Sequence, residues 1–383
     1  MRFHGYRRTD GSVGVRNHVV VVSTVLCSSE VTRDIARATS AMAITHEGGC
    51  GELGAEKEHT ERMLRGVLRH PNVGAALIVG LGCEQIEPER LAKAAAVADK
   101  PVRFLSIQEC GGPSASVRLG TEMVRELAAK IANADRQPAS LADMVLATQC
   151  GGSDTGSGLA SNPGLGAAAD LIVAGGGTVI LGETGGLYGA AGFLTRRAAT
   201  PDVAKRILEI TDAIERHSQR LGKSIKEANP TPGNIAGGLT TLVEKALGGV
   251  RKAGTSLIQG VVQPGERVTG KGLWVMDTSV GIGACAMSDM LVGGAQILAY
   301  TTGRGNPLGS PLGPVIKITA TAETAKSLHE IIDFDASPVL RGEETIQECG
   351  KRLLDEMLAV AGGKLAKSEQ LGHYAFAIGK IAR

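Results

Sequence analysis

Apolar runs alternate with polar, helix-forming stretches along the first third of the chain. Residues 19–25 read VVVVSTV, a near-continuous β-branched run that is typical of a strand covered on both faces. A turn follows, and then a segment with helical periodicity. The same unit recurs, with further apolar runs at residues 41–45, at residues 75–80 and in the stretch VRFLS. Between two of these runs, residues 57–69 place their apolar side chains on one helical face. This alternation predicts a parallel sheet whose strands are joined by right-handed helical crossovers.

A cysteine follows each of these four apolar runs within a few residues. The four are Cys27, Cys50, Cys83 and Cys110. Because the carboxyl ends of parallel strands lie along one edge of a sheet, and ligands bind at that edge, we expect these thiols on the functional rim. The alternative for any one of them is a small buried apolar side chain, which is a common role of free cysteine.

A second series of strand, turn and helix begins after a polar segment. Residues 131–140 contain Pro138 and are the best linker candidate, so we expect domains at residues 1–135 and 141–383. The expected strands of the second series end near Cys150, Glu183, Asp277 and residues 301–304. The predicted fold class is α/β, with two consecutive Rossmann-like parallel-sheet domains and helices on both faces of each sheet.

The composition argues against some classes of binding partner and indicates a cellular compartment. The 383 residues carry a formal net charge of +2, which gives no strong field for nucleic acid or anionic lipid. The sequence contains no apolar run of eighteen residues, and its N-terminus lacks the apolar core of a signal peptide, so we expect a cytoplasmic chain. Seven cysteines in such a chain favour reduced thiols over a disulfide framework. The 53 glycines predict many tight turns.

The polar side chains at the strand ends of the second series suit a small anionic substrate. They are Cys150, Ser153, Asp154, Glu183, Asp277 and Arg304. Glycine turns and helix starts offer free N–H groups to a carboxylate. Arg304 is a candidate for a two-pronged contact with that carboxylate, and the alternative is an arginine that is solvated or paired at the surface.

The turn THEGGCG combines His46, Glu47 and Cys50. Imidazole can transfer a proton near neutral pH, and imidazole with thiolate suits zinc or iron. No C-x-x-C pair occurs, so any metal must be held by ligands from distant segments. Residues 49–54 of the same turn also satisfy G-x-G-x-x-G, which leaves open a nicotinamide-dependent oxidoreductase. A further alternative is a non-catalytic scaffold that needs no metal.

Several motifs taken together resemble the large subunit of the altronate and galactarate dehydratase family. They are GYRRTDGSVGVRNHVVVVSTVLCSS, THEGGCG, IVGLGCE, TQCGGSDTGSGLASNPGLGAAADLI, LGETGGLYGA, NPTPGNIAGGLTTLVEKALG and TTGRGNP. They occur in the family's order and cover nearly the whole chain. The sequence is also similar, in its length and its MRFHGY start, to the large subunit of 3-sulfolactate sulfo-lyase, a member of the same superfamily.

This resemblance implies an iron-dependent lyase. The enzyme would remove water from a sugar acid to give a 2-keto-3-deoxy acid, or sulfite from sulfolactate to give pyruvate. The iron would be Fe²⁺ or part of an iron–sulfur cluster, and a separate small SAF-type subunit and an oligomeric assembly are expected. Where sugar-acid members commonly have QETGG, this chain has QECGG, and NPLGSPLGP replaces a cysteine-containing segment after TTGRG, which leaves the choice of substrate open.

The resemblance also implies roles for individual residues. The metal ligands are expected at Cys27, Cys50, Cys83 and Cys150, and the catalytic residues at His46, Glu183 and Arg304. The substrate-binding residues are expected at Asn17, Ser153, Asp154, Asn234, Thr302 and Gly303. Our mechanistic hypothesis is that iron binds the substrate oxygens, that His46 or Glu183 moves the C2 proton, and that Arg304 and the glycine turns hold the carboxylate.

Overall fold

The two halves of the chain form two parallel sheets in the computed structural model, which describes residues 1–95, 100–279 and 283–381. The first sheet has the order β4-β3-β5-β6, and all of its pairs are parallel. Its strands are β3 (His18–Ser23), β4 (Met42–Ile44), β5 (Val73–Gly80) and β6 (Val102–Ser106). The alternation of strands with helices therefore predicted this sheet correctly.

Helices cover both faces of the first sheet because its strands are apolar on both sides. Val21 packs in a cluster with α1 (Ser29–Thr39) and α4 (Pro113–Ile131). Its neighbours Val20 and Val22 point to the opposite face, toward α2 (Ala55–Arg69) and α3 (Pro88–Ala95). This reversal follows the two-residue period of a strand. A near-continuous valine run is what such a doubly covered strand requires.

The second sheet has seven parallel strands in the order β10-β11-β9-β8-β12-β13-β14. They are β8 (Val145–Cys150), β9 (Thr178–Leu181), β10 (Ile258–Val262), β11 (Gly272–Met276), β12 (Ile297–Thr301), β13 (Val315–Thr319) and β14 (Phe334–Asp335). One face packs against α5 (Asn162–Ala174), α7 (Pro201–Arg220) and α14 (Ile346–Ala361). The other face packs against α11 (Gly283–Val292). The α/β class with parallel sheets is confirmed.

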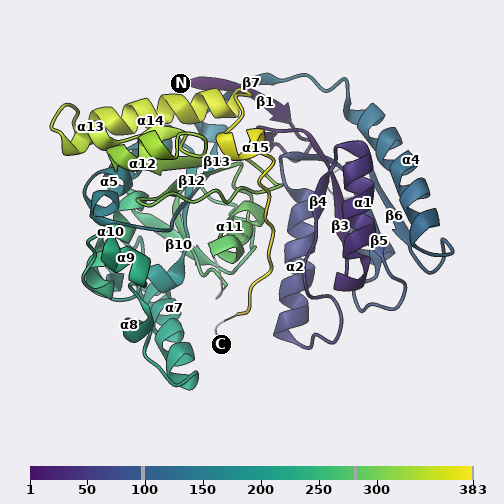
Figure 1. Cartoon of the computed structure of the whole chain (residues 1–383), viewed down its shortest axis with the longest axis horizontal. Helices are drawn as coiled ribbons and strands as arrows, with labels where there is room; N and C mark the ends of the chain where they lie inside the picture. The colour runs from purple at the N-terminus through teal and green to yellow at the C-terminus, as the bar shows by residue number, and fades with distance from the viewer. Residues whose placement is uncertain (96–99, 280–282, 382–383) are drawn as a thin grey trace.

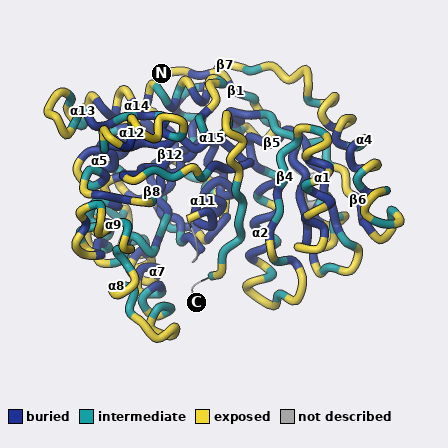
Figure 2. Tube along the Cα trace, viewed as in Figure 1, coloured by how far each residue is buried: buried dark blue, intermediate teal, exposed yellow. Residues whose placement is uncertain are grey.

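A single apolar cluster joins the two sheets. It contains side chains of α2 and α11 together with residues from both sheets. The two helices lie between the sheets in Figure 1, and α11 is buried throughout except at its first residue (Figure 2). Asn72 reinforces the junction, because its side-chain amide donates to the carbonyl oxygens of Gln296 and Leu312, both at 2.9 Å. No helix among the described residues is long and apolar enough to cross a membrane.

The predicted linker ends in a strand, which is a correction to the sequence analysis. Within residues 131–140, β7 (Gln137–Ser140) pairs antiparallel with β1 (Arg2–Arg7), and β1 pairs in turn with β2 (Val13–Gly14). Pro138 is tolerated because β7 is the edge strand of this small sheet. Near the other end of the chain, the short helix α12 spans Ala322–Ser327.

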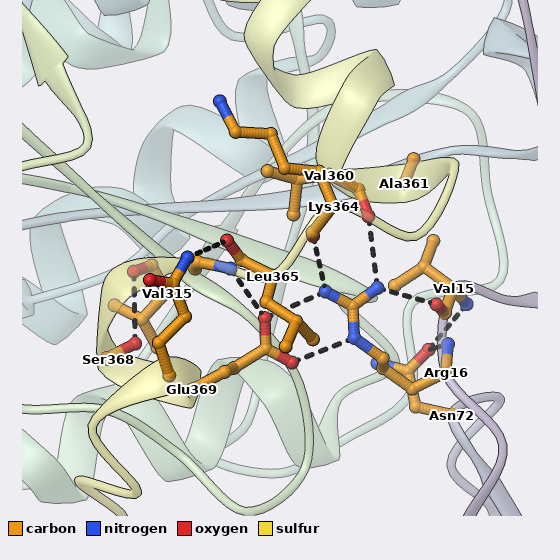
Figure 3. A network of polar contacts seen from close by, with 12 residues as sticks. Val15, Arg16, Asn72, Val315, Val360, Ala361, Lys364, Leu365, Ser368 and Glu369 are labelled. Carbon is orange, nitrogen blue, oxygen red and sulfur yellow. Dashed lines mark hydrogen bonds and ion pairs between the residues drawn. The ribbon is translucent and has the colours of Figure 1, made fainter.

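A buried ion pair holds the last helix, α15 (Lys367–Gln370), against the start of the first sheet (Figure 3). Arg16 meets the Glu369 carboxylate through Nε at 2.8 Å and Nη2 at 2.7 Å. The same guanidinium donates to the carbonyl oxygens of Val360 at 3.0 Å and Lys364 at 2.9 Å. Beyond α15, the C-terminal segment, residues 371–381, runs between α11 and α2 (Figure 1).

Candidate active site

The strand order places one crevice of the second sheet between β8 and β12. The chain leaves β8 toward β9 on one side, and β12 later pairs with β8 on the other side. Such a reversal of strand order opens a crevice at the carboxyl ends of the strands, where ligands bind. The two loops meet there, because the Gly303 and Arg304 amides donate to the Gly152 carbonyl oxygen at 3.1 and 3.0 Å.

Asp154, which was predicted to bind substrate, makes hydrogen bonds that fix this loop. Its Oδ1 accepts hydrogen bonds from Ser157 N at 2.7 Å and Ser157 Oγ at 2.8 Å, and its Oδ2 accepts one from Thr321 Oγ1. A Cβ on Gly303 would lie 2.0 Å from Asp154 Cγ, so glycine is required there for close packing. Thr302 Oγ1 accepts from Gly305 N at 3.0 Å. The crevice therefore brings Asp154, Thr302 and Gly303 together, and their role in substrate binding stays a prediction.

Hydrogen bonds link Ser153 and Asn234 to Lys245, a residue that was not among the predicted site residues. Asn234 Nδ2 donates to the Ser153 carbonyl oxygen at 2.9 Å, and its Oδ1 accepts from Lys245 Nζ at 3.1 Å. Ser153 and Lys245 border a cavity of about 190 Å³, which Arg251 also borders. The buried Ser153 Oγ has no hydrogen-bond partner among the described residues. Two carboxylates, Asp154 and Glu244, border the same cavity, so its two cations are balanced by two acidic side chains.

Glu183 lies at the end of β9, where it forms the centre of a buried cluster with Cys150 and Lys252. Its Oε2 accepts from Lys252 Nζ at 2.9 Å, from Cys150 N at 3.2 Å and from Cys150 Sγ at 3.2 Å. Lys252 Nζ also lies 2.9 Å from Cys150 Sγ. We call these three residues the Glu183 cluster. The Glu183 backbone is left-handed, with φ +66°, a strained conformation that clusters at functional sites.

Burial and charge together set the protonation of the Glu183 cluster. Burial raises the pKa of Glu183, but the Lys252 ammonium and the hydrogen bonds outweigh it and hold this pKa below the ordinary value. Burial and the Glu183 carboxylate raise the pKa of the Cys150 thiol. Burial lowers the pKa of Lys252. The combined effect of Cys150 and Glu183 is larger and raises this pKa above its ordinary value. At neutral pH the cluster is therefore a carboxylate, an ammonium and a neutral thiol.

Glu183 is the member of this cluster that reaches a large cavity. The cavity has a volume of about 700 Å³ and is also bordered by Gln149, His217 and Ser279. The Glu183 side chain is 26% exposed, against 1% for Lys252. Gln149 donates through Nε2 to the Gly283 carbonyl oxygen at 2.8 Å, while its buried Oε1 has no partner among the described residues. Glu183 and Gln149 thus border one cavity.

A hydrogen bond of Lys245 links a residue at the border of the small cavity with a residue at the border of the large one. Lys245 borders the small cavity and donates to Asn229 Oδ1 at 2.9 Å, and Asn229 borders the large one. The Lys245 charge also lowers the pKa of Glu183. Neither cavity is bordered by Arg304, whose side chain is exposed. The predicted contact of Arg304 with a substrate carboxylate stays a prediction.

His46 is held by the backbone on both sides of its ring. Nε2 lies 3.1 Å from the Ser23 carbonyl oxygen, and Nδ1 accepts from Gly48 N at 3.2 Å. These bonds fix a neutral tautomer with the proton on Nε2. Burial lowers the pKa of His46 to about 4, against the weaker opposing effect of the Ser23 hydrogen bond. The geometry favours a structural role for His46 over proton transfer.

Three of the predicted metal ligands lie on adjacent turns of the first sheet. Leu26 N donates to the Gly48 carbonyl oxygen at 3.1 Å, and Thr24 Oγ1 donates to Glu84 Oε1 at 2.7 Å, so the turns bearing Cys27, Cys50 and Cys83 are tied together. All three of these cysteines are free and exposed. Gly49, part of the G-x-G-x-x-G spacing, allows these turns to approach closely. A Cβ added there would lie 2.1 Å from the Thr24 carbonyl oxygen.

The fourth predicted ligand, Cys150, belongs to the second sheet and to the Glu183 cluster. The predicted set is thus divided between two sheets. Among the residues that the structure describes, no group of three His, Cys, Asp or Glu side chains is arranged to hold a metal ion. The iron site therefore stays a prediction. Asn17 lies at the opposite edge of the first sheet, at the start of β3, where it accepts from Arg8 Nη1 at 3.0 Å.

Sequence reasoning missed Lys252, Lys245 and Gln149. Lys245 and Gln149 lie within motifs that carried the family resemblance, so a closer reading of those motifs could have selected them. Lys252, in η6 (Arg251–Ala253), gave no signal, because a lysine in a polar turn is ordinarily solvated. Lys252 is buried because its turn packs against the ends of β8 and β9, and the local sequence does not record that contact.

Asp289 of α11 supports a pH-dependent prediction. It accepts hydrogen bonds from Ser279 N at 2.7 Å and Ser279 Oγ at 2.6 Å, but burial dominates and raises the pKa of Asp289 from 3.8 to about 7. The unfolded chain releases this proton near pH 3.8, whereas the folded chain keeps it until about pH 7. The contribution of Asp289 to stability is therefore greatest at low pH and declines as the pH rises through this window.

We expect Asp289→Asn to remove this decline. Between pH 5 and 7, the free energy of unfolding of the wild type should fall by about 2 kcal/mol relative to the variant, at about 1.4 kcal/mol per pH unit. Urea unfolding at pH 5, 6 and 7 measures the difference. Other buried groups, such as His46, are common to both proteins and cancel. Parallel pH profiles for the two proteins would contradict the prediction.

Comparison with known proteins places both halves of the chain in one family. Residues 141–383 match the family model for the D-galactarate/altronate dehydratase C-terminal region, and residues 5–132 match the model for the D-galactarate dehydratase/altronate hydrolase second domain. The chain is 35% identical to (2R)-sulfolactate sulfo-lyase subunit beta of Chromohalobacter salexigens, over 99% of this chain and 97% of that protein.

Two sugar-acid enzymes are similar over most of this chain. The chain is 32% identical to altronate dehydratase of Bacillus subtilis, over 96% of this chain and 75% of that protein. It is 34% identical to the L-threo-forming galactarate dehydratase of Escherichia coli, over 94% of this chain and 73% of that protein. The motifs, the two sheets and these matches agree, and the chain belongs to the D-galactarate/altronate dehydratase family.

Proposed function

We propose that this protein is a lyase that removes water from a sugar acid such as altronate or galactarate and forms a 2-keto-3-deoxy acid. The observation that carries the proposal is Glu183, an ionised carboxylate in strained backbone that borders a cavity of about 700 Å³. The family membership supports the reaction class, because relatives with this activity are similar over most of the chain.

The reaction requires a base beside the substrate's C2 carbon. Glu183 takes the C2 proton, the C–H electron pair forms the C2–C3 double bond, and the C3–O bond breaks to release water once the departing oxygen is protonated. The resulting enol converts to the 2-keto acid. His217 of α7, which borders the same cavity, is our candidate for the group that protonates the departing oxygen.

Lys252 and Cys150 position the base in this proposal. Lys252 is buried and holds one carboxylate oxygen of Glu183. Cys150 donates its backbone N–H and its thiol to the same oxygen, Oε2. The second oxygen, Oε1, is left for the substrate proton. Gln149 borders the same cavity, and we propose that its Oε1, which has no partner among the described residues, accepts a hydrogen bond from a substrate hydroxyl.

Iron is predicted from the family resemblance and remains to be tested. Because the described side chains do not assemble a three-ligand site, we assign no reaction step to a metal. If iron binds, a Lewis acid would supply charge stabilisation for the substrate's oxygens. Cys27, Cys50 and Cys83 remain the proposed ligands, since their turns are in contact.

A second candidate function is release of sulfite from 3-sulfolactate. One observation favours it: the chain is 35% identical to the sulfolactate sulfo-lyase subunit beta, against 32% for the altronate dehydratase of Bacillus subtilis. The same base would act on the same C2 proton, and a C–S bond would break in place of C–O. The name of that relative also supports a second subunit, and we propose a small SAF-type partner for this chain.

The experiment is an assay of anaerobically purified protein, with its small subunit and with its iron content measured. Aldonates, aldarates and 3-sulfolactate are supplied separately, and 2-keto acid and sulfite are measured for each. We expect 2-keto acid from at least one sugar acid. Sulfite and pyruvate from sulfolactate alone would establish the second candidate instead. No product from any substrate at full iron content would overturn the lyase assignment.

A further inference from the structure

The C-terminal segment, residues 371–381, forms part of the wall of the large cavity. Ile378, Gly379 and Lys380 border it together with Glu183. This segment comes from the far end of the sequence and belongs to no strand of the second sheet. It reaches the cavity by running down the junction between α11 and α2 (Figure 1). A segment of irregular backbone thus completes a cavity otherwise bordered by the second sheet and its helices.

Hydrogen bonds and packing hold the segment in this position. Ala375 N donates to the Gly309 carbonyl oxygen at 3.0 Å, and Ala377 N donates to Ser288 Oγ of α11 at 3.1 Å. Phe376 and Ile378 are partly buried against the apolar cluster that joins the two sheets. At Gly379 the fit is close, because an added Cβ would lie 2.6 Å from Ser279 Oγ and 2.9 Å from Cys285 Cβ.

The segment is also anchored at its start. Arg16 and Glu369 are both 7% exposed in their side chains, and two N–H groups of the guanidinium meet the two carboxylate oxygens. Figure 3 shows this pair between the carbonyl oxygens of Val360 and Lys364 and the backbone before β3. Such a bidentate, buried pair has a defined geometry. The point at which residues 371–381 begin is therefore fixed relative to both sheets.

The charge balance of the cavity points to the role of this segment. Glu183 is the acidic group among the described residues that border it, and Lys252 already neutralises that charge from below. Lys380 is the one lysine or arginine among those bordering residues, and its side chain is exposed. An anionic hydroxy acid placed beside Glu183 would need a cation at the cavity wall.

We propose that the C-terminal segment is a fixed wall of the active site and that Lys380 binds an oxyanion of the substrate, a carboxylate or sulfonate. This inference rests on the proposed function, since it concerns the same cavity. Lys380 acts as a specificity-determining residue: it contacts the anionic group and takes no part in moving the C2 proton. Its loss should therefore weaken binding more than turnover.

Lys380→Gln tests this role with a small surface change. We expect KM for the hydroxy acid to rise about 10-fold or more while kcat changes less than about 3-fold, because a charged hydrogen bond is lost from binding. Lys380→Arg keeps the charge and should restore most of the affinity. The matched control is Lys364→Gln, an exposed lysine that pairs with Glu356 outside the cavity, which should leave both constants unchanged.

A second variant, lacking residues 378–383, removes the wall itself. We expect at least the same rise in KM, with circular dichroism and the unfolding midpoint used to establish that the rest of the chain is folded. Wild-type KM in both variants would overturn the inference while leaving the proposed function intact. Absence of any turnover by the wild-type protein would instead overturn the proposed function, so the two failures are distinguishable.

Discussion

Replacing Glu183 by glutamine will lower kcat by about 10²- to 10⁴-fold, the range expected for loss of a positioned general base. Glutamine has the same size and keeps an acceptor for Lys252 Nζ and Cys150 N, so the hydrogen bonds of the turn after β9 can persist. What is lost is the negative charge that takes the C2 proton. The measurement is the initial rate of 2-keto acid formation at saturating substrate.

Two comparisons make this result specific. Glu323→Gln, an exposed carboxylate in α12, should leave kcat unchanged. Because Glu183→Gln leaves the Lys252 charge buried without its counter-ion, the variant will also be less stable, so rates must be divided by the folded fraction. Loss of a general base costs far more than about 3-fold in kcat. A variant kcat within about 3-fold of wild type, per folded protein, would therefore show that Glu183 is not the base.

Replacing Lys252 by methionine will reduce the free energy of unfolding by about 3–5 kcal/mol, the usual result of removing one partner of a buried ion pair. Glu183 would keep a buried negative charge without the ammonium 2.9 Å away. This is a large part of the 5–15 kcal/mol by which a typical protein is stable. Urea unfolding at pH 7 measures the loss, and Lys205→Met, an exposed change in α7, is the control.

The double variant Glu183→Gln with Lys252→Met separates charge pairing from packing. It leaves neither charge unpaired, so we expect it to lose less stability than the sum of the two single variants. A coupling of roughly 1–3 kcal/mol is expected for side chains in direct contact. Strictly additive losses would mean that the two side chains do not act as a pair in the folded protein.

The strands and helices of the first sheet were predictable because their signals are local. The valine run at residues 19–25 corresponds to β3 (His18–Ser23), and the periodic segment at residues 57–69 lies within α2 (Ala55–Arg69). The expectation that three cysteine-bearing turns share one edge also follows from strand direction alone, and those turns are in contact. In the same way, Glu183 was selected because it follows an apolar run.

Contacts between distant segments were not predictable in this way. Cys150 was expected at a strand end of the second series, but the sequence does not show that its thiol contacts Glu183 and Lys252. His46 carried the residue types of a catalytic turn, yet the backbone occupies both of its ring nitrogens. The roles of both side chains depend on which groups surround them after packing, and those groups are far away in the sequence.

The sequence alone determined two series of parallel strands with polar residues at their ends, because hydrophobic periodicity and turn residues act over a few neighbouring positions. The tertiary structure alone decided which of those ends carry chemistry. Lys252 meets Glu183 across 69 residues of chain, and the C-terminal segment reaches the same cavity from beyond the last helix. A buried charge acquires its partner, and its pKa, through packing that no local pattern records.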